Sequence, residues 1–186
     1  MNLKNSMKNS SFFIILLAHL MGTAQDLPQV TYGNIERIEN FKTDLVEPRN
    51  IVIWLPENYD TKKQYAVVYM HDGQMLFDST RTWNKTAWDA DETFGNLLQS
   101  RKIKDCIIVG ICNVPERRFA DYFPQNIIED IPEPTRTKIL EKQINGKPSA
   151  NNYLKFVVTE LKPYIDKNYA TKTEAEHTFM IGSSMG

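Results

Sequence analysis

The sequence HTFMIGSSMG at residues 177–186 joins a short apolar run to a tight turn. The run from His177 to Ile181 is rich in β-forming residues and is typical of a strand. The turn fits the pattern G-x-S-x-G, in which Gly182 and Gly186 avoid clashes where a strand reverses into a helix. The segment therefore predicts a strand that leads directly into a sharp turn with Ser184 at its tip.

A serine in this setting is typical of a nucleophile. A serine hydroxyl reacts poorly unless a turn exposes it, a base lies beside it and amide donors face the developing oxyanion. The turn meets the first of these requirements, so it favours acyl-transfer chemistry on Ser184. A simple Gly/Ser turn after a strand is the alternative interpretation, and the preceding sequence has to decide between the two.

Upstream of this turn, apolar runs alternate with amphipathic segments. We expect helices at 89–100 and 153–169, and strands at 35–41, 50–55, 65–70, 106–112 and 177–181. Runs that are apolar throughout indicate strands buried on both faces, so the order predicts an α/β fold whose mostly parallel sheet is covered by helices on both faces. We expect the last three strands to be interior neighbours and the second to lie nearer the edge. Ser184 then falls at the carboxyl end of a strand, where such sheets place their sites.

The N-terminus predicts export. Lys4 and Lys8 precede an apolar run at 12–21, and small residues at 22–24 suit cleavage before Gln25. We therefore expect a signal peptide at 1–24 and a periplasmic or extracellular protein. A membrane anchor or a buried helix is the alternative, although ten apolar residues are about half of what a membrane span requires.

The composition argues against several classes of function. The 22 Lys+Arg balance 23 Asp+Glu without a basic stripe, so we expect no nucleic-acid partner. Cys106 and Cys112 would lie roughly 20 Å apart along one strand, too far for a disulfide, and we expect both to be buried thiols. The scattered His19, His71 and His177 lack the spacing of metal ligands. We expect no metal and no cofactor.

Four patterns follow one another in the chain. The stretch YMHDGQMLFD at 69–78 contains hDGQ-x-x-F-D; TWN at 82–84 and WDADE at 88–92 give W-N and W-x-x-D-E. The third is VGI at 109–111 followed by Asn113, Arg117, Arg118 and DYFP at 121–124, and the fourth is GSSMG at 182–186. Together they resemble the esterase D/putative esterase family of α/β-hydrolases over roughly residues 35–186. That family includes feruloyl and acetylxylan esterases, enterochelin-type esterases, S-formylglutathione hydrolases and mycolyltransferases.

The resemblance implies roles for three residues. Ser184 is the nucleophile, and the backbone N–H groups of Met185 and Gln74 form the oxyanion hole. The general geometry of α/β-hydrolases agrees, because one donor follows the nucleophile and the other comes from the loop after the third strand. Asp72 is expected to be a buried structural residue of that loop.

The long segment 113–150 is rich in proline and charge, and we expect it to be a functional loop at the rim of the site. Trp83 and Trp88 could stack there on a sugar or a phenolic acyl group, and Arg117 or Arg118 could pair with a substrate carboxylate. The alternative, which we favour, is that the tryptophans anchor loops in the core and that the arginines pair with Glu116 or Asp121.

In α/β-hydrolases the acid and the histidine follow the serine along the chain, and His71 and His177 both precede it. His177 would also stand roughly 20 Å away at the other end of its strand. We therefore expect residues 25–186 to be the N-terminal part of an esterase domain, with its acid and base downstream, and the 186-residue chain alone to be inactive.

The sequence thus predicts an exported serine carboxylic ester hydrolase that acts through an acyl-enzyme on small-molecule or glycan-linked esters. Acylated sugars, siderophores and similar esters are the candidate substrates. Two alternatives stay open: an acyltransferase of the same fold, in which a sugar hydroxyl replaces water, and an inactive or non-catalytic binding fragment.

Overall fold

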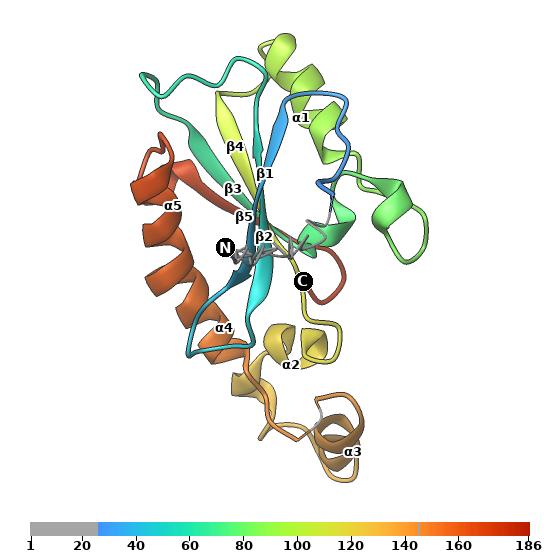
Figure 1. Ribbon diagram of the computed structural model, residues 1–186. Helices are drawn as coiled ribbons and strands as arrows, with labels where there is room; N and C mark the ends of the chain where they lie inside the picture. Colours follow the sequence, from blue (N-terminus) through green and yellow to red (C-terminus); the bar gives the residue numbers. More distant parts are fainter. Residues whose placement is uncertain (1–25, 145) are drawn as a thin grey trace, which may run out of the picture.

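The computed structural model of the chain describes residues 26–144 and 146–186. Within these residues five strands form one sheet in the order β1-β2-β4-β3-β5 (Figure 1). The strands are β1 Asn34–Phe41, β2 Arg49–Leu55, β3 Ala66–His71, β4 Cys106–Ile111 and β5 Thr178–Ile181. The expected signal peptide at 1–24 lies outside the described residues.

The sheet is mixed. β4, β3 and β5 are parallel neighbours, as expected, whereas β1 pairs with β2 and β2 pairs with β4 in antiparallel directions. In the described sheet β5 lies at one edge rather than in the interior, and β2 lies one strand in from the other edge. The carboxyl ends of β3, β4 and β5 therefore meet at one end of the sheet, where the turns after β3 and β5 lie side by side.

Each strand sends alternate side chains to opposite faces of the sheet. In β2, Ile51 and Ile53 belong to one core cluster, whereas Val52 and Trp54 belong to the other. All four side chains are almost completely buried. The uninterrupted apolar runs of the sequence thus become strands covered on both faces.

Helices cover both faces (Figure 1). One face packs against α1 (Ala90–Gln99), whose Phe94 and Leu98 join the cluster of Trp54. The other face packs against α4 (Ala150–Phe156), the π-helical segment η4 (Val157–Leu161) and α5 (Lys162–Asn168), which follow one another without a break. The wider π turn accommodates Pro163, which has no N–H to donate to the preceding turn.

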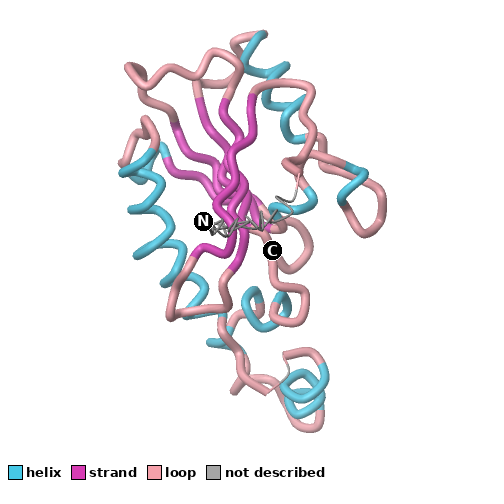
Figure 2. Tube along the Cα trace, viewed as in Figure 1, coloured by secondary structure: helices cyan, strands magenta, loops and turns pink. Residues whose placement is uncertain are grey.

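The segment between β4 and α4 forms short helices in its described residues. It contains α2 (Arg118–Tyr122), the 3-10 turn η3 (Gln125–Ile127) and α3 (Thr135–Lys142). These elements extend from one end of the sheet (Figure 2), and they enclose a small apolar cluster of their own around Ala120, Ile128 and Ile144. The segment is therefore a small lobe with its own apolar cluster rather than a plain loop.

Both cysteines are free, and Cys106 and Cys112 pack on the same side of the sheet. Burial raises the pKa of each thiol to about 12, so both are protonated and unreactive at neutral pH. Among the described residues no helix combines the length and the apolar character that crossing a membrane requires.

A buried ion pair fastens the lobe to the sheet. Arg49, the first residue of β2, donates from Nη2 to Asp121 Oδ2 of α2 at 2.9 Å, and the two side chains are 1% and 2% exposed. The guanidinium also lies over the rings of Tyr153 and Phe156, at 5.2 and 5.7 Å from their centroids. Removing one partner of such a pair leaves an uncompensated buried charge.

We therefore expect Arg49→Leu in the full-length protein to lower the free energy of unfolding by about 3–5 kcal/mol. The matched control is Arg136→Leu, because Arg136 forms its ion pairs with the exposed Glu129 and Glu133. Surface pairs contribute little, so the control should leave the unfolding midpoint in urea almost unchanged. Equal midpoints for the two variants would contradict this assignment.

Candidate active site

The turn after β5 adopts the strained geometry that exposes a side chain. Ser184 has a left-handed φ of 60°, and the Gly186 N–H donates to the Ser183 carbonyl at 3.0 Å. A Cβ atom on Gly182 would clash with the backbone carbonyl group of Gly186. Only glycine fits at position 182, which explains the first glycine of the G-x-S-x-G pattern.

The turn after β3 is equally tight. Asp72 has a φ of 55°, and it leads into the 3-10 turn η1 (Gly73–Met75), whose Met75 N–H donates to the Asp72 carbonyl at 2.7 Å. A Cβ atom on Gly73 would lie 2.6 Å from the carbonyl carbon of Gly110 in β4. The absence of a side chain at position 73 thus lets this turn rest directly on the neighbouring strand.

The two turns open into one cleft of about 480 Å³. Ser184 and Gln74, which the sequence assigns to the nucleophile and to an oxyanion donor, both line it. The other lining residues are Asp72, Met75, Trp83, Asn84, Trp88, Asn113, Pro115, Arg118 and Ser183. The fold therefore brings together, from positions 110 residues apart, the expected nucleophile and the residue expected to supply an oxyanion donor.

The backbone N–H groups of Gln74 and Met185 have no acceptor among the described residues. Backbone N–H groups without an internal partner are available to a ligand oxygen, and Gln74 lines the cleft of Ser184. Met185 is not among the residues that line this cleft; it lines a smaller cavity on the other side of the turn.

Asp72 is the centre of a polar network at the edge of the cleft. Its carboxylate accepts hydrogen bonds from Arg118 Nε at 2.8 Å, from Arg118 Nη2 at 2.7 Å and from Asn113 Nδ2 at 2.6 Å. The Asn113 backbone N–H in turn donates to Gln74 Oε1 at 3.1 Å. Burial alone would raise the pKa of Asp72, but these hydrogen bonds and the nearby positive charge outweigh it and hold the pKa below its ordinary value.

The network corrects the expected ion pairs. Arg118 pairs with Asp72, not with Glu116 or Asp121, and Arg117 donates to the Lys147 carbonyl and to Ser149 Oγ. Asp121 pairs with Arg49, a residue that the sequence did not single out. Arg118 and Asp72 are 46 residues apart, and Arg49 and Asp121 are 72 residues apart, so no local sequence pattern predicts these ion pairs.

Of the two tryptophans, one differs from expectation. Trp83 is 86% exposed, so it is not a core anchor; its ring stands at the cleft instead. Trp88 is half-buried, packs against the cluster of Phe77 and Ala90, and also reaches the cleft. Trp83 therefore presents a free aromatic surface near Ser184.

His71 ends β3 and lies close to the serine turn, but it lines the smaller cavity of about 200 Å³ on the Met185 side. Its ring stacks on Tyr122 with centroids 4.7 Å apart. Burial lowers the pKa of His71, and the nearby Asp72 charge opposes this effect. His177 precedes β5 at the end opposite Ser184. Neither histidine lines the cleft of Ser184.

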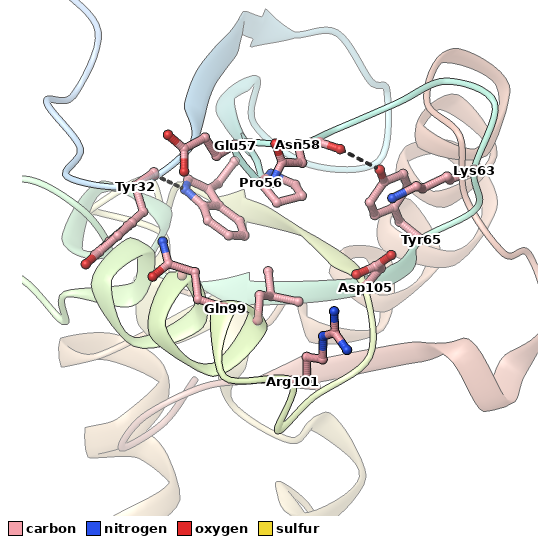
Figure 3. Close-up of a pocket in the computed structure, with 12 residues that line it drawn as sticks. Tyr32, Pro56, Glu57, Asn58, Lys63, Tyr65, Gln99, Arg101 and Asp105 are labelled. Atoms are coloured by element: carbon pink, nitrogen blue, oxygen red, sulfur yellow. Dashed lines mark hydrogen bonds between the residues drawn. The ribbon is translucent and has the colours of Figure 1, made fainter.

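A further cavity of about 330 Å³ lies where β3 and β4 begin, at the end of the sheet opposite the serine (Figure 3). Its walls include Pro56, Tyr65 and Asp105, and Tyr65 Oη donates to the Asn58 carbonyl at 3.3 Å. Within residues 26–144 and 146–186, no three His, Cys, Asp or Glu side chains are grouped so as to hold a metal ion.

Two curated proteins with related sequences are longer than this chain. YjcH of Bacillus subtilis, an uncharacterized protein, is 27% identical over 156 residues, which cover 83% of this chain and 52% of YjcH. An endo-1,4-beta-xylanase/feruloyl esterase of Xylanibacter ruminicola is 25% identical over 171 residues, covering 84% of this chain and 19% of that protein. The chain thus spans about half the length of the first relative and a smaller share of the second.

Solved structures show the same fold. An IroE-like serine hydrolase from Shewanella oneidensis matches with a TM-score of 0.55 and 26% identity, over 82% of this chain and 43% of that one. A ferulic acid esterase from Anaeromyces mucronatus, solved with ferulic acid, matches with a TM-score of 0.53 and 23% identity, over 86% and 52%. The described residues therefore adopt an α/β-hydrolase fold.

The family model "Putative esterase" matches residues 43–186, which include both cleft-forming turns. The segments that carry the resemblance are those that build the cleft: the turn after β3, the end of β4 and the serine turn after β5. The chain belongs to the putative esterase family.

Proposed function

We propose that the full-length protein is a carboxylic ester hydrolase with Ser184 as its nucleophile. The observation that carries the proposal is the shared cleft, in which Ser184, on a left-handed turn, lies together with Gln74 of the turn after β3. Family membership supports the same chemistry, as do the relatives described as a feruloyl esterase and a serine hydrolase.

In this reaction Ser184 Oγ attacks the ester carbonyl carbon while a base takes the hydroxyl proton. The carbonyl oxygen becomes an oxyanion, which accepts hydrogen bonds from the N–H groups of Gln74 and Met185. The C–O bond to the alcohol then breaks, and the alcohol leaves with the proton from the base. Water attacks the resulting acyl-enzyme by the same route and releases the acid. We propose that the acid and histidine follow Ser184 along the chain, in the order usual for this fold.

The walls of the cleft favour an aromatic or sugar-linked ester. Trp83, Trp88 and Met75 give it an apolar side with an exposed indole, a surface on which a flat phenolic acyl group or a sugar ring can stack. The feruloyl and ferulic acid esterases among the relatives act on esters of this kind by their descriptions. An exported enzyme, as the sequence at 1–24 predicts, would meet glycan-linked esters outside the cell.

Ser184→Ala in the full-length protein should abolish hydrolysis of an activated aryl acetate and leave the fold intact, because it removes one hydroxyl from a turn. Ser183→Ala is the matched control within the same turn and should keep most of the activity, since only the third position of G-x-S-x-G is presented to the substrate. Initial rates and circular dichroism of both variants check this. Activity retained in Ser184→Ala would rule out Ser184 as the nucleophile.

Trp83→Ala should raise the KM for a feruloyl ester about threefold to tenfold, as expected for the loss of one aromatic contact. The KM for an acetyl ester of the same alcohol should stay near the wild-type value, because an acetyl group has no ring to stack. Trp83→Phe keeps a ring and should recover most of the loss. Equal effects on both substrates would show that Trp83 does not contact the acyl group.

A further inference from the structure

We propose that Arg118 and Asp72 are positioning residues for the oxyanion hole: their paired hydrogen bonds hold the left-handed turn that aims the Gln74 N–H into the cleft. This inference rests on the proposed function, because it assigns the means by which one donor of that function is held in place. Asp72 precedes Gln74 by two positions, and Arg118 binds Asp72. Neither residue has to contact the reacting atoms.

The first step is the conformation of Asp72. A φ of 55° is unfavourable for a residue with a side chain, and it persists only where the surroundings hold it. At Asp72 the side chain itself stabilises this backbone conformation, because its carboxylate accepts three hydrogen bonds and the side chain is only 5% exposed. If the carboxylate lost these partners, the turn that follows it would be free to relax.

The second step is the geometry of the arginine. Arg118 binds Asp72 with Nε and Nη2 together, and this bidentate arrangement fixes both the distance and the orientation of the carboxylate. The guanidinium also lies 5.2 Å from the centroid of the Tyr122 ring, one turn further along α2. Arg118 is therefore held by its own helix and is engaged by Asp72, which makes it a poor ligand for a substrate carboxylate.

The third step is the link from Asp72 to Gln74. Asn113 donates its side-chain amide to Asp72 and its backbone N–H to Gln74 Oε1. The residue two positions before Gln74 and the side chain of Gln74 itself are thus tied to the same asparagine. These two hydrogen bonds restrain the backbone between Asp72 and Gln74, which includes the Gln74 N–H. The Gln74 side chain therefore acts in this restraint and does not bind the substrate.

The test measures kcat and KM of the full-length protein on an activated aryl acetate. Arg118→Met removes the guanidinium with its two hydrogen bonds to Asp72, and Arg118→Lys keeps the positive charge without the paired geometry. Removing an oxyanion donor outright costs roughly 10²–10³ in kcat, so we expect a loosened donor to cost about tenfold to hundredfold in Arg118→Met, with KM within about twofold. Arg118→Lys should lie between Arg118→Met and the wild type.

Arg117→Met is the matched control. Arg117 is the adjacent arginine and also donates two hydrogen bonds, but to the Lys147 carbonyl and Ser149 Oγ, on groups away from Asp72. We expect its kcat to equal that of the wild type. A fall in kcat in Arg117→Met as large as that in Arg118→Met would mean that any disturbance of α2 slows the enzyme, and it would overturn the inference.

A second readout separates positioning from stability. An aryl trifluoromethyl ketone forms a bond from its carbonyl carbon to Ser184 Oγ, passes the serine proton to the base and leaves an oxyanion in the hole. Its Ki should rise in the Arg118 variants by the factor by which kcat/KM falls, because both report binding of the oxyanion. A purely structural role would lower Tm and leave the Ki and the kcat of the folded enzyme unchanged.

Asn113→Ala covers the case in which Arg118→Met does not fold. It deletes the amide that donates to Asp72 and keeps the backbone N–H that donates to Gln74, so we expect a fall in kcat of about threefold to tenfold. If Arg118→Lys and Asn113→Ala fold and keep the wild-type kcat and Ki, this inference is overturned but the proposed function is not. Turnover that survives Ser184→Ala would instead overturn the proposed function, so the two failures are distinguishable.

Discussion

The site depends on one close contact between two glycines. Gly73, in the turn after β3, rests on Gly110 of β4: a Cβ atom on Gly73 would lie 2.6 Å from the Gly110 carbonyl carbon, and one on Gly110 would lie 3.2 Å from Gly73 Cα. Real Cβ atoms essentially never come within 2.6 Å of a backbone atom, so a side chain at position 73 would push the turn away from the sheet. Because the turn lies flat on β4, Gln74 reaches Asn113, which follows β4, and stays within the cleft of Ser184.

Helix α2 adds a second level of organisation. It carries Arg118 and Asp121, three residues apart and so near one another on the helix surface. Asp121 pairs with a residue of the sheet, and Arg118 pairs with the residue that directly follows β3. Asp121 meets Arg49 at the start of β2 in a pair that is almost fully buried, whereas Arg118 meets Asp72 at the end of β3 beside the open cleft. A short helix of five residues is thus fixed against two strands by opposite charges. The buried pair fastens the lobe to the sheet, and the partly exposed pair acts on the turn that holds Gln74.

Much of the fold and of the candidate site could be predicted from the sequence. The exceptions all depend on contacts between segments that lie far apart in the chain. Uninterrupted apolar runs such as 106–112 located the strands within a residue or two, and the G-x-S-x-G pattern located the serine turn. An apolar run carries no information about direction, however, so the antiparallel pairings of β2 did not follow from it. Partners such as Arg118 and Asp72 lie far apart in the chain, and several nearby carboxylates were equally plausible. The exposure of Trp83 depends on where its loop packs, which residue type alone does not decide.

Two residues with side chains in left-handed conformation, Asp72 and Ser184, face the same cleft, and the fold stabilises them in different ways. Each such conformation costs about 1–3 kcal/mol and needs compensation nearby. At Ser184 the compensation is space: the glycines at 182 and 186 are small enough to let the chain turn back on itself. At Asp72 it is a set of hydrogen bonds that reach into α2 and the end of β4. A side chain at Gly182 would therefore break the serine turn, whereas the oxyanion side of the cleft can be adjusted in graded steps through residues that do not contact the substrate.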